Sequence, residues 1–197
     1  MNAPMLDPRR GRRQLLLVAA VFFLPIALAA GLALSGWVPA ARSHGEPILP
    51  QENFAAIPVT LHDGALWPWK AATPQYTLLA LAGPDCSNDC IATLDLLHRA
   101  QVGLNKSSDK LRLLYVGDAP QPAAADAAGA QTVLAAWAQG RSDAPALQRF
   151  VPAARDSLTV ILVAADGTAI VRYPPQPGLA PEQRVLQINK DLKRLFK

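Results

Sequence analysis

The chain has 197 residues, of which 51% are hydrophobic, and a formal net charge of +4. A chain of this length accommodates one domain and an additional terminal segment. Four arginines within residues 9–13, set against Asp7, account for a net +3 of that charge, so the composition gives no reason to expect a nucleic-acid partner.

Residues 15–34, LLLVAAVFFLPIALAAGLAL, contain no charged side chain. A helix of this length covers roughly 30 Å, the thickness of a bilayer's hydrocarbon core. The arginines precede the run, and the positive-inside rule places them in the cytoplasm. We therefore expect a cytoplasmic basic tail over residues 1–14, a transmembrane anchor over 15–36 and a domain in the periplasm of a bacterium. The alternative, a cleaved signal peptide, normally has a shorter apolar core of about 7–15 residues.

Residues 37–56 are rich in proline, alanine and polar side chains, which is typical of a linker. We expect the folded domain to occupy residues 57–197. It begins with alternating apolar residues from Ile57 to Leu61 and an Asp63-Gly64 turn, which together predict a small hairpin. The nearly continuous apolar run from Tyr76 to Gly83 then predicts a strand that is buried on both faces.

The next three segments predict a β-α-β unit. Gly83-Pro84 ends the strand, and apolar residues at helical spacing predict a helix from about Cys86 to Leu104. The segment from Lys110 to Asp118 alternates as a second strand does. Because the helix crosses between the two strands, we expect them to be parallel neighbours.

The C-terminal half predicts a short helix over residues 131–140, a β-hairpin and a final helix. The hairpin strands are Leu158–Val163 and Ala169–Tyr173, with Asp166-Gly167 at the turn, and the amphipathic helix begins at Pro181. The complete order predicts an α/β fold in which a central mixed sheet has helices on both faces.

The chain has two cysteines, Cys86 and Cys90, at the start of the first predicted helix. Backbone N–H groups at a helix start favour a thiolate, the form that attacks disulfides and binds metal. Residues four apart share a helix face, so the sulfurs can form a disulfide or hold a soft ion such as Cu(I). Asp85 and Asp89 oppose thiolate formation, and the sequence leaves the balance open. A disulfide across so short a loop gains little stability, which argues against a purely structural role.

A cysteine motif where the first long strand meets its helix is the thioredoxin-like arrangement. The motif GPDCSNDC, the N-terminal span, the Leu61-His62-Asp63-Gly64 turn and the late VILVAADGTAIVRY hairpin together resemble the Sco/SenC family. These membrane-anchored proteins help to build the copper centre of cytochrome c oxidase. The resemblance implies a Sco-like thioredoxin fold over residues 57–197, Cys86 as the attacking thiolate and Cys90 as the resolving thiol or second Cu(I) ligand. It also implies copper as cofactor and an oxidase subunit or another assembly factor as partner.

The sequence departs from that family in two respects. The family's distal copper-binding histidine is missing from VPAARDSLTVIL, which leaves His62 to act as a third ligand if the first hairpin folds over the cysteines. Asp156-Ser157 also occupies the place where thioredoxin-like oxidoreductases carry a cis-proline.

Three functions stay open: a factor for oxidase copper-centre assembly by Cu(I) handling or thiol reduction, a general periplasmic thiol-disulfide reductase, and a non-catalytic scaffold.

Overall fold

The computed structural model describes residues 8–34, 43–121 and 127–196, and the chain forms two compact units, residues 1–42 and 43–197. The first unit contains helix α1 (Pro8–Leu34). Residues 1–7 of the expected basic tail and residues 35–42 of the expected anchor and linker lie outside the described residues. Among the helices that are described, none has the combined length and apolar character needed to cross a bilayer, so the membrane span stays a prediction.

The second unit is built on one mixed sheet, and seven of its strands are described, in the spatial order β1-β7-β6-β3-β4-β5-β2. The central strands β3, β4 and β5 are parallel, and every other neighbouring pair is antiparallel. The predicted mixed sheet is therefore confirmed. The strand bounds are β1 (Glu46–Asn53), β2 (Thr60–Leu61), β3 (Tyr76–Ala82), β4 (Leu111–Val116), β5 (Ala138–Arg141), β6 (Leu158–Val163) and β7 (Thr168–Tyr173).

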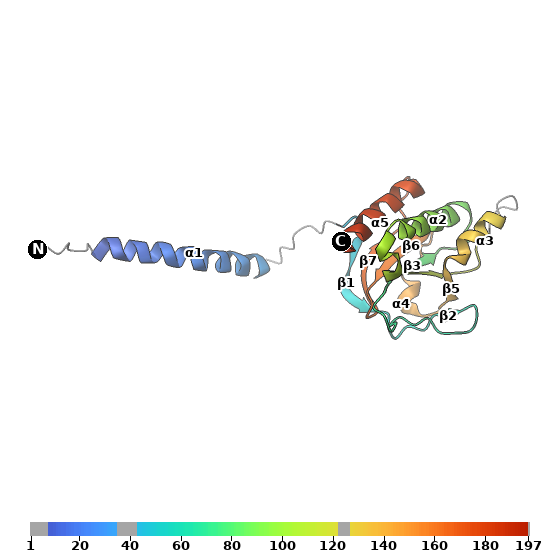
Figure 1. Cartoon of the computed structure of the whole chain (residues 1–197), viewed down its shortest axis with the longest axis horizontal. Helices are drawn as coiled ribbons and strands as arrows, with labels where there is room; N and C mark the ends of the chain where they lie inside the picture. Colours follow the sequence, from blue (N-terminus) through green and yellow to red (C-terminus); the bar gives the residue numbers. More distant parts are fainter. Residues whose placement is uncertain (1–7, 35–42, 122–126, 197) are drawn as a thin grey trace, which may run out of the picture. The chain divides into compact units, whose positions relative to one another are not determined.

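Helices cover both faces of this sheet. On one face, α2 and α5 lie side by side (Figure 1) and pack Leu94, Leu97 and Ile188 against the central strands. On the other face, α4 and the segment before β3 contribute a second core around Phe54, Trp69 and Phe150. The helical bounds are α2 (Asn88–Val102), the 3₁₀ helix η1 (Asn105–Lys110), α3 (Ala127–Ala135), α4 (Pro145–Gln148) and α5 (Pro181–Leu195).

The expectation of a linker over residues 37–56 is wrong for residues 46–53, which form β1 at one edge of the sheet. Glu46 pairs with Arg172 and Asn53 with Thr168 on β7, and Ile48 is buried. The two prolines of EPILPQEN suggested a linker. An edge strand tolerates proline because the missing N–H costs no hydrogen bond where it faces away from the sheet.

Two helix boundaries also differ from those expected. Helix α2 begins at Asn88, two residues after Cys86, because Ser87, with φ −126° and ψ −125°, lies outside the helical region. Residues 138–141 form strand β5, although the sequence predicted that the preceding helix extends to residue 140.

Candidate redox site

The two cysteines are joined as a disulfide where β3 leads into α2. Cys86 lies in the connecting segment and Cys90 lies in the first turn of the helix. Their Cα atoms are 5.2 Å apart, a separation that a disulfide spans without backbone movement. The spacing of the motif therefore does bring the two sulfurs together, as the sequence suggested.

The disulfide is buried. The exposed fraction is 4% for Cys86 and 1% for Cys90, and both residues belong to the same core cluster as Ala82 and Leu158. The loop after β4 is attached at this place, since the backbone N–H of Gln121 donates to the Cys86 carbonyl oxygen at 2.8 Å. Because thiol exchange requires access to sulfur, the surroundings must open before a partner reaches this pair.

Asp156 caps the helix that carries Cys90. Its Oδ1 accepts hydrogen bonds from the backbone N–H groups of Ser87 (2.8 Å) and Cys90 (3.0 Å), and its Oδ2 accepts one from Asp89 (3.0 Å). The Ser87 side chain at the N-cap position makes no capping bond of its own. Burial raises the pKa of Asp156, but the three backbone bonds outweigh this effect and hold the pKa below its usual value.

Close backbone contacts hold Asp156 in this position. The Gly83 N–H donates to the Ser157 carbonyl oxygen at 2.9 Å, and the Asp156 N–H donates to the Pro84 carbonyl oxygen at 3.2 Å. A Cβ atom at Gly83 would lie 2.4 Å from the carbonyl oxygen of Ala154, so only glycine allows this approach. Asp156 itself has φ +50°, a conformation that aspartate tolerates better than most residues.

The sequence located Asp156 but missed its role. Its position just ahead of the late hairpin, two residues before Leu158, was the available signal, because that place lies beside the cysteines in thioredoxin-like proteins. The contact itself joins residues 69 positions apart along the chain, and no local pattern reports it.

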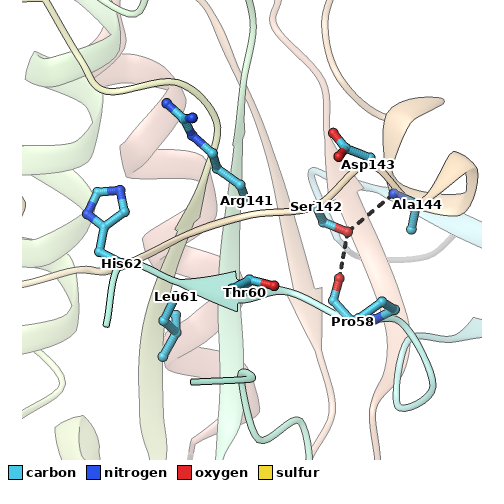
Figure 2. A pocket seen from close by; sticks show the side chains of 8 residues that line it. All are labelled: Pro58, Thr60, Leu61, His62, Arg141, Ser142, Asp143 and Ala144. Atoms are coloured by element: carbon cyan, nitrogen blue, oxygen red, sulfur yellow. Dashed lines mark hydrogen bonds between the residues drawn. The ribbon is translucent and has the colours of Figure 1, made fainter. Parts of the chain in front are cut away.

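His62 is not brought to the cysteines, so its expected role as a third copper ligand is wrong. It is exposed beyond β2 and lines a cavity of about 790 Å³ together with Arg141 (Figure 2). Strand β2 lies three strands away from β3 in the sheet, a lateral offset of roughly 14 Å. Within the described part of the chain, no group of three or more His, Cys, Asp or Glu residues could hold a metal ion.

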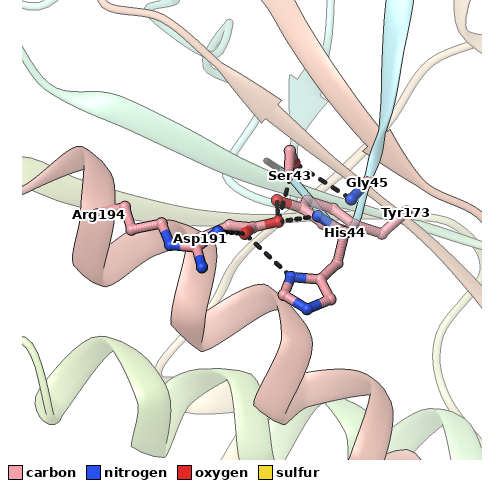
Figure 3. A network of polar contacts seen from close by, with 6 residues as sticks. All are labelled: Ser43, His44, Gly45, Tyr173, Asp191 and Arg194. Atoms are coloured by element: carbon pink, nitrogen blue, oxygen red, sulfur yellow. Dashed lines mark hydrogen bonds and ion pairs between the residues drawn. The ribbon is translucent and has the colours of Figure 1, made fainter. Parts of the chain in front are cut away.

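The other two histidines lie on other parts of the fold. The His44 backbone N–H and Nδ1 bind the Asp191 carboxylate at 2.7 and 3.1 Å, and the Tyr173 hydroxyl donates to the same group at 3.1 Å (Figure 3). This network fastens the chain ahead of β1 to α5. His98 is half-buried on α2. A copper ion at the reduced cysteines would thus have two sulfur ligands, which suits Cu(I).

Comparison with known proteins finds two family models that match this chain. The model described as "Transmembrane-like, thioredoxin-like, C-terminal domain" matches residues 76–197, and "Transmembrane-like, N-terminal domain" matches residues 6–35. A search of curated proteins finds no match.

Solved structures that match include apo Sco1 from Thermus thermophilus, at 18% identity and a TM-score of 0.49, covering 80% of this chain and 99% of that one. Copper-bound ScoI from Bradyrhizobium japonicum matches at 19% identity and a TM-score of 0.40, covering 76% and 98%. Peroxiredoxin Q from Xanthomonas campestris matches at 13% identity and a TM-score of 0.47, covering 77% and 100%.

The mixed sheet and the cysteine pair at the β3–α2 junction agree with the match to the first family model, which covers more than half of the sequence. The chain therefore belongs to the family of transmembrane-like proteins with a thioredoxin-like C-terminal domain.

Proposed function

We propose that this chain is a membrane-anchored thioredoxin-fold factor whose Cys86–Cys90 pair cycles between disulfide and dithiol outside the cytoplasm. Its role would be in the assembly of the copper centre of cytochrome c oxidase, by reducing an oxidase subunit or another assembly factor or by passing Cu(I) to it. The observation that carries the proposal is the disulfide at the junction of β3 and the first turn of α2.

The reductive reaction uses both sulfurs in turn. The Cys86 thiolate attacks a partner disulfide and forms a mixed disulfide, and the first partner thiolate leaves. The Cys90 thiolate then attacks the Cys86 sulfur, which closes the internal disulfide and releases the second partner thiolate. Two electrons pass to the partner, and an external dithiol protein of the same compartment must return two electrons to restore the pair.

Features of the first unit support a membrane location. Helix α1 exposes large apolar side chains between Leu17 and Leu28, among them Phe22, Phe23 and Ile26. A helical segment that is apolar on all sides, as residues 15–34 are, requires an apolar environment. The arginines in the first turns of α1, ahead of its apolar run, and the match to a transmembrane-like N-terminal model agree with a single span whose N-terminus is cytoplasmic. The compartment of the second unit would then be the periplasm of a bacterium, where a disulfide persists.

Two other functions are compatible with this fold and its cysteine pair. A general periplasmic thiol-disulfide reductase is favoured by the absence of a third metal ligand in the described part of the chain. A non-catalytic scaffold is favoured by the burial of both cysteines. The experiments below distinguish the three.

The redox test uses the full chain in detergent micelles, equilibrated with mixtures of reduced and oxidised glutathione, quenched with acid and labelled with a maleimide. We expect wild type to convert between zero and two labelled sulfurs within the range of the buffer. Cys86→Ser and Cys90→Ser should each retain one thiol that forms no internal disulfide. A pair that stays oxidised under strongly reducing conditions would exclude redox cycling and leave the scaffold.

The copper test titrates the reduced full chain with Cu(I) under anaerobic conditions against a competing chelator. One bound equivalent that is lost in both single serine variants supports Cu(I) handling. Redox cycling without copper binding supports thiol reduction alone. In cells, wild-type oxidase copper content after replacement of both cysteines by serine would contradict any role of the pair in oxidase assembly.

A further inference from the structure

The residue that caps α2, Asp156, carries a negative charge and lies far from the helix along the chain, in the segment before β6. Helices are usually capped by their own N-cap side chain, but here Ser87 makes no capping bond and the cap comes from Asp156, two residues before β6 begins. The Asp156 carboxylate accepts bonds from the N–H groups of Ser87, Asp89 and Cys90. These three donors lie between and beside the two sulfurs along the chain.

Free N–H groups at a helix start are the usual source of thiolate stabilisation in thioredoxin-like sites. In this protein the carboxylate already occupies them at 2.8 to 3.0 Å. A thiolate formed at either sulfur would compete with Asp156 for the same donors and would also be repelled by its charge. The disulfide carries no charge, so it coexists with the capping carboxylate without that repulsion.

The carboxylate is positioned to keep its charge. Asp156 is half-buried and also lines a cavity of about 410 Å³ together with Asp89 and Thr93 of α2. It therefore retains contact with the surface while its oxygens are held by the helix. The bonds that hold the neighbouring backbone, from Gly83 to Ser157 and from Asp156 to Pro84, fix the carboxylate against the first turn.

We infer that Asp156 is a positioning residue that sets the redox balance of the Cys86–Cys90 pair toward the disulfide, so that the reduced pair is a strong electron donor. This inference rests on the proposed redox function. Pairs whose reduced thiolate is stabilised act as oxidants, and pairs that lack this stabilisation act as reductants. The capping charge thus matches a protein that gives two electrons to a partner disulfide.

The test measures the equilibrium between protein dithiol plus oxidised glutathione and protein disulfide plus two reduced glutathiones, at pH 8.5, with the full chain in detergent. Asp156→Asn keeps the size of the side chain and removes its charge. We expect the equilibrium constant for disulfide formation to fall at least tenfold, which corresponds to a potential less negative by about 30 mV.

Asp85→Asn is the matched control. Asp85 precedes Cys86 and is exposed, its carboxylate pairs with Arg155 at 3.3 Å, and it accepts none of the three helix N–H bonds. Solvent screens its charge, so we expect a change of less than threefold. A change as large as that of Asp156→Asn would overturn the specific role of the cap.

A second readout separates redox tuning from mere stabilisation of the fold. We expect Asp156→Asn to lower the melting temperature of the oxidised protein more than that of the reduced protein, because only the reduced state gains thiolate stabilisation when the charge is removed. Equal losses in both states, with an equilibrium constant within twofold of wild type, would overturn the inference while leaving the redox function intact. A wild-type disulfide that even excess dithiothreitol leaves oxidised would overturn both.

Discussion

Gly83 directly follows β3, where two segments of backbone approach each other more closely than a side chain permits. A Cβ atom there would lie 2.4 Å from the Ala154 carbonyl oxygen and 2.9 Å from that of Pro152. Neither oxygen belongs to a flexible side chain, so the clash is relieved only by moving backbone. The same approach places Asp156 against α2, and the glycine is therefore part of what positions the redox site.

We expect Gly83→Ala to lower the free energy of unfolding by about 1–3 kcal/mol, the usual cost of overpacking. Gly129→Ala is the control, because its Cβ would meet nothing within 4 Å in helix α3. Alanine there should be neutral or stabilising by up to about 1 kcal/mol. Urea unfolding of the full chain in mild detergent measures both variants, and equal stabilities would contradict the close approach.

Asp191 is a second carboxylate with several donors. It receives hydrogen bonds from the His44 backbone, the Ser43 hydroxyl and the Tyr173 hydroxyl (Figure 3). Burial raises its pKa, but the bonds from His44, Ser43 and Tyr173 outweigh burial, and the pKa lies below its usual value. A carboxylate with a lowered pKa in the folded state stabilises the fold above its unfolded pKa, near 3.9, and loses that contribution as the pH falls through the folded value.

We therefore expect Asp191→Asn to be less stable than wild type at pH 6, by about 1–3 kcal/mol. The two proteins should begin to approach each other as the pH falls below 4, because the unfolded wild-type chain then takes up a proton at Asp191, and the difference is lost as the pH falls through the lower folded-state pKa. Urea unfolding at pH 6, 4 and 3 measures the difference. A gap between the proteins that is constant over this range would show that the ionised state of Asp191 contributes nothing.

At the scale of elements, β1 shows how an edge strand completes the domain. It pairs with β7 and places Ile48 in the core that also holds Phe54 and Trp69. The His44 network fixes the chain just before it to α5. Residues 43–53 are thus part of the folded unit, which begins at residue 43.

We expect Ile48→Ala to destabilise the protein by about 2–5 kcal/mol, the usual loss for a buried isoleucine. Ile48 is 5% exposed, whereas Ile170 on the neighbouring strand β7 is 36% exposed. Ile170→Ala should therefore cost clearly less, and it serves as the control on an adjacent strand. If the two substitutions have the same small effect in urea unfolding, β1 does not contribute to the stability of the sheet.

At the scale of the whole molecule, the proposed function places the two units in different surroundings, the first in the lipid bilayer and the second in water. The first unit exposes apolar side chains on α1, whereas the second encloses two cores around its sheet. The proposed span of α1 would hold the redox unit at the membrane, where an oxidase subunit is also located. Because the second unit buries the disulfide, thiol exchange would be restricted to partners that can open the site.

Reporter fusions at Lys197 test the proposed topology. We expect alkaline phosphatase fused there to be active, because it folds outside the cytoplasm, and green fluorescent protein fused there to be dark when exported unfolded. Replacing the four arginines of residues 9–13 by glutamate should reduce phosphatase activity, because the positive-inside signal is removed. A fluorescent fusion without phosphatase activity would place the C-terminal unit in the cytoplasm.

The sequence by itself determined most of the elements and the location of the redox pair. The apolar run of β3, the Asp166-Gly167 turn between β6 and β7, and the amphipathic pattern of α5 are local signals, and each predicted element is present. The spacing of Cys86 and Cys90 likewise allowed a disulfide before any tertiary contact was known. Such features depend on residues that are near one another along the chain.

Only the tertiary structure decided how that pair is surrounded. It added β1 to the sheet, kept His62 three strands away from β3, buried both cysteines and placed Asp156 on the N–H groups of α2. The Asp156 contact spans 69 positions and the His44–Asp191 contact spans 147. Contacts between residues so far apart along the chain depend on the spatial order of the strands in the sheet. A periodic pattern within one segment contains no information about that order.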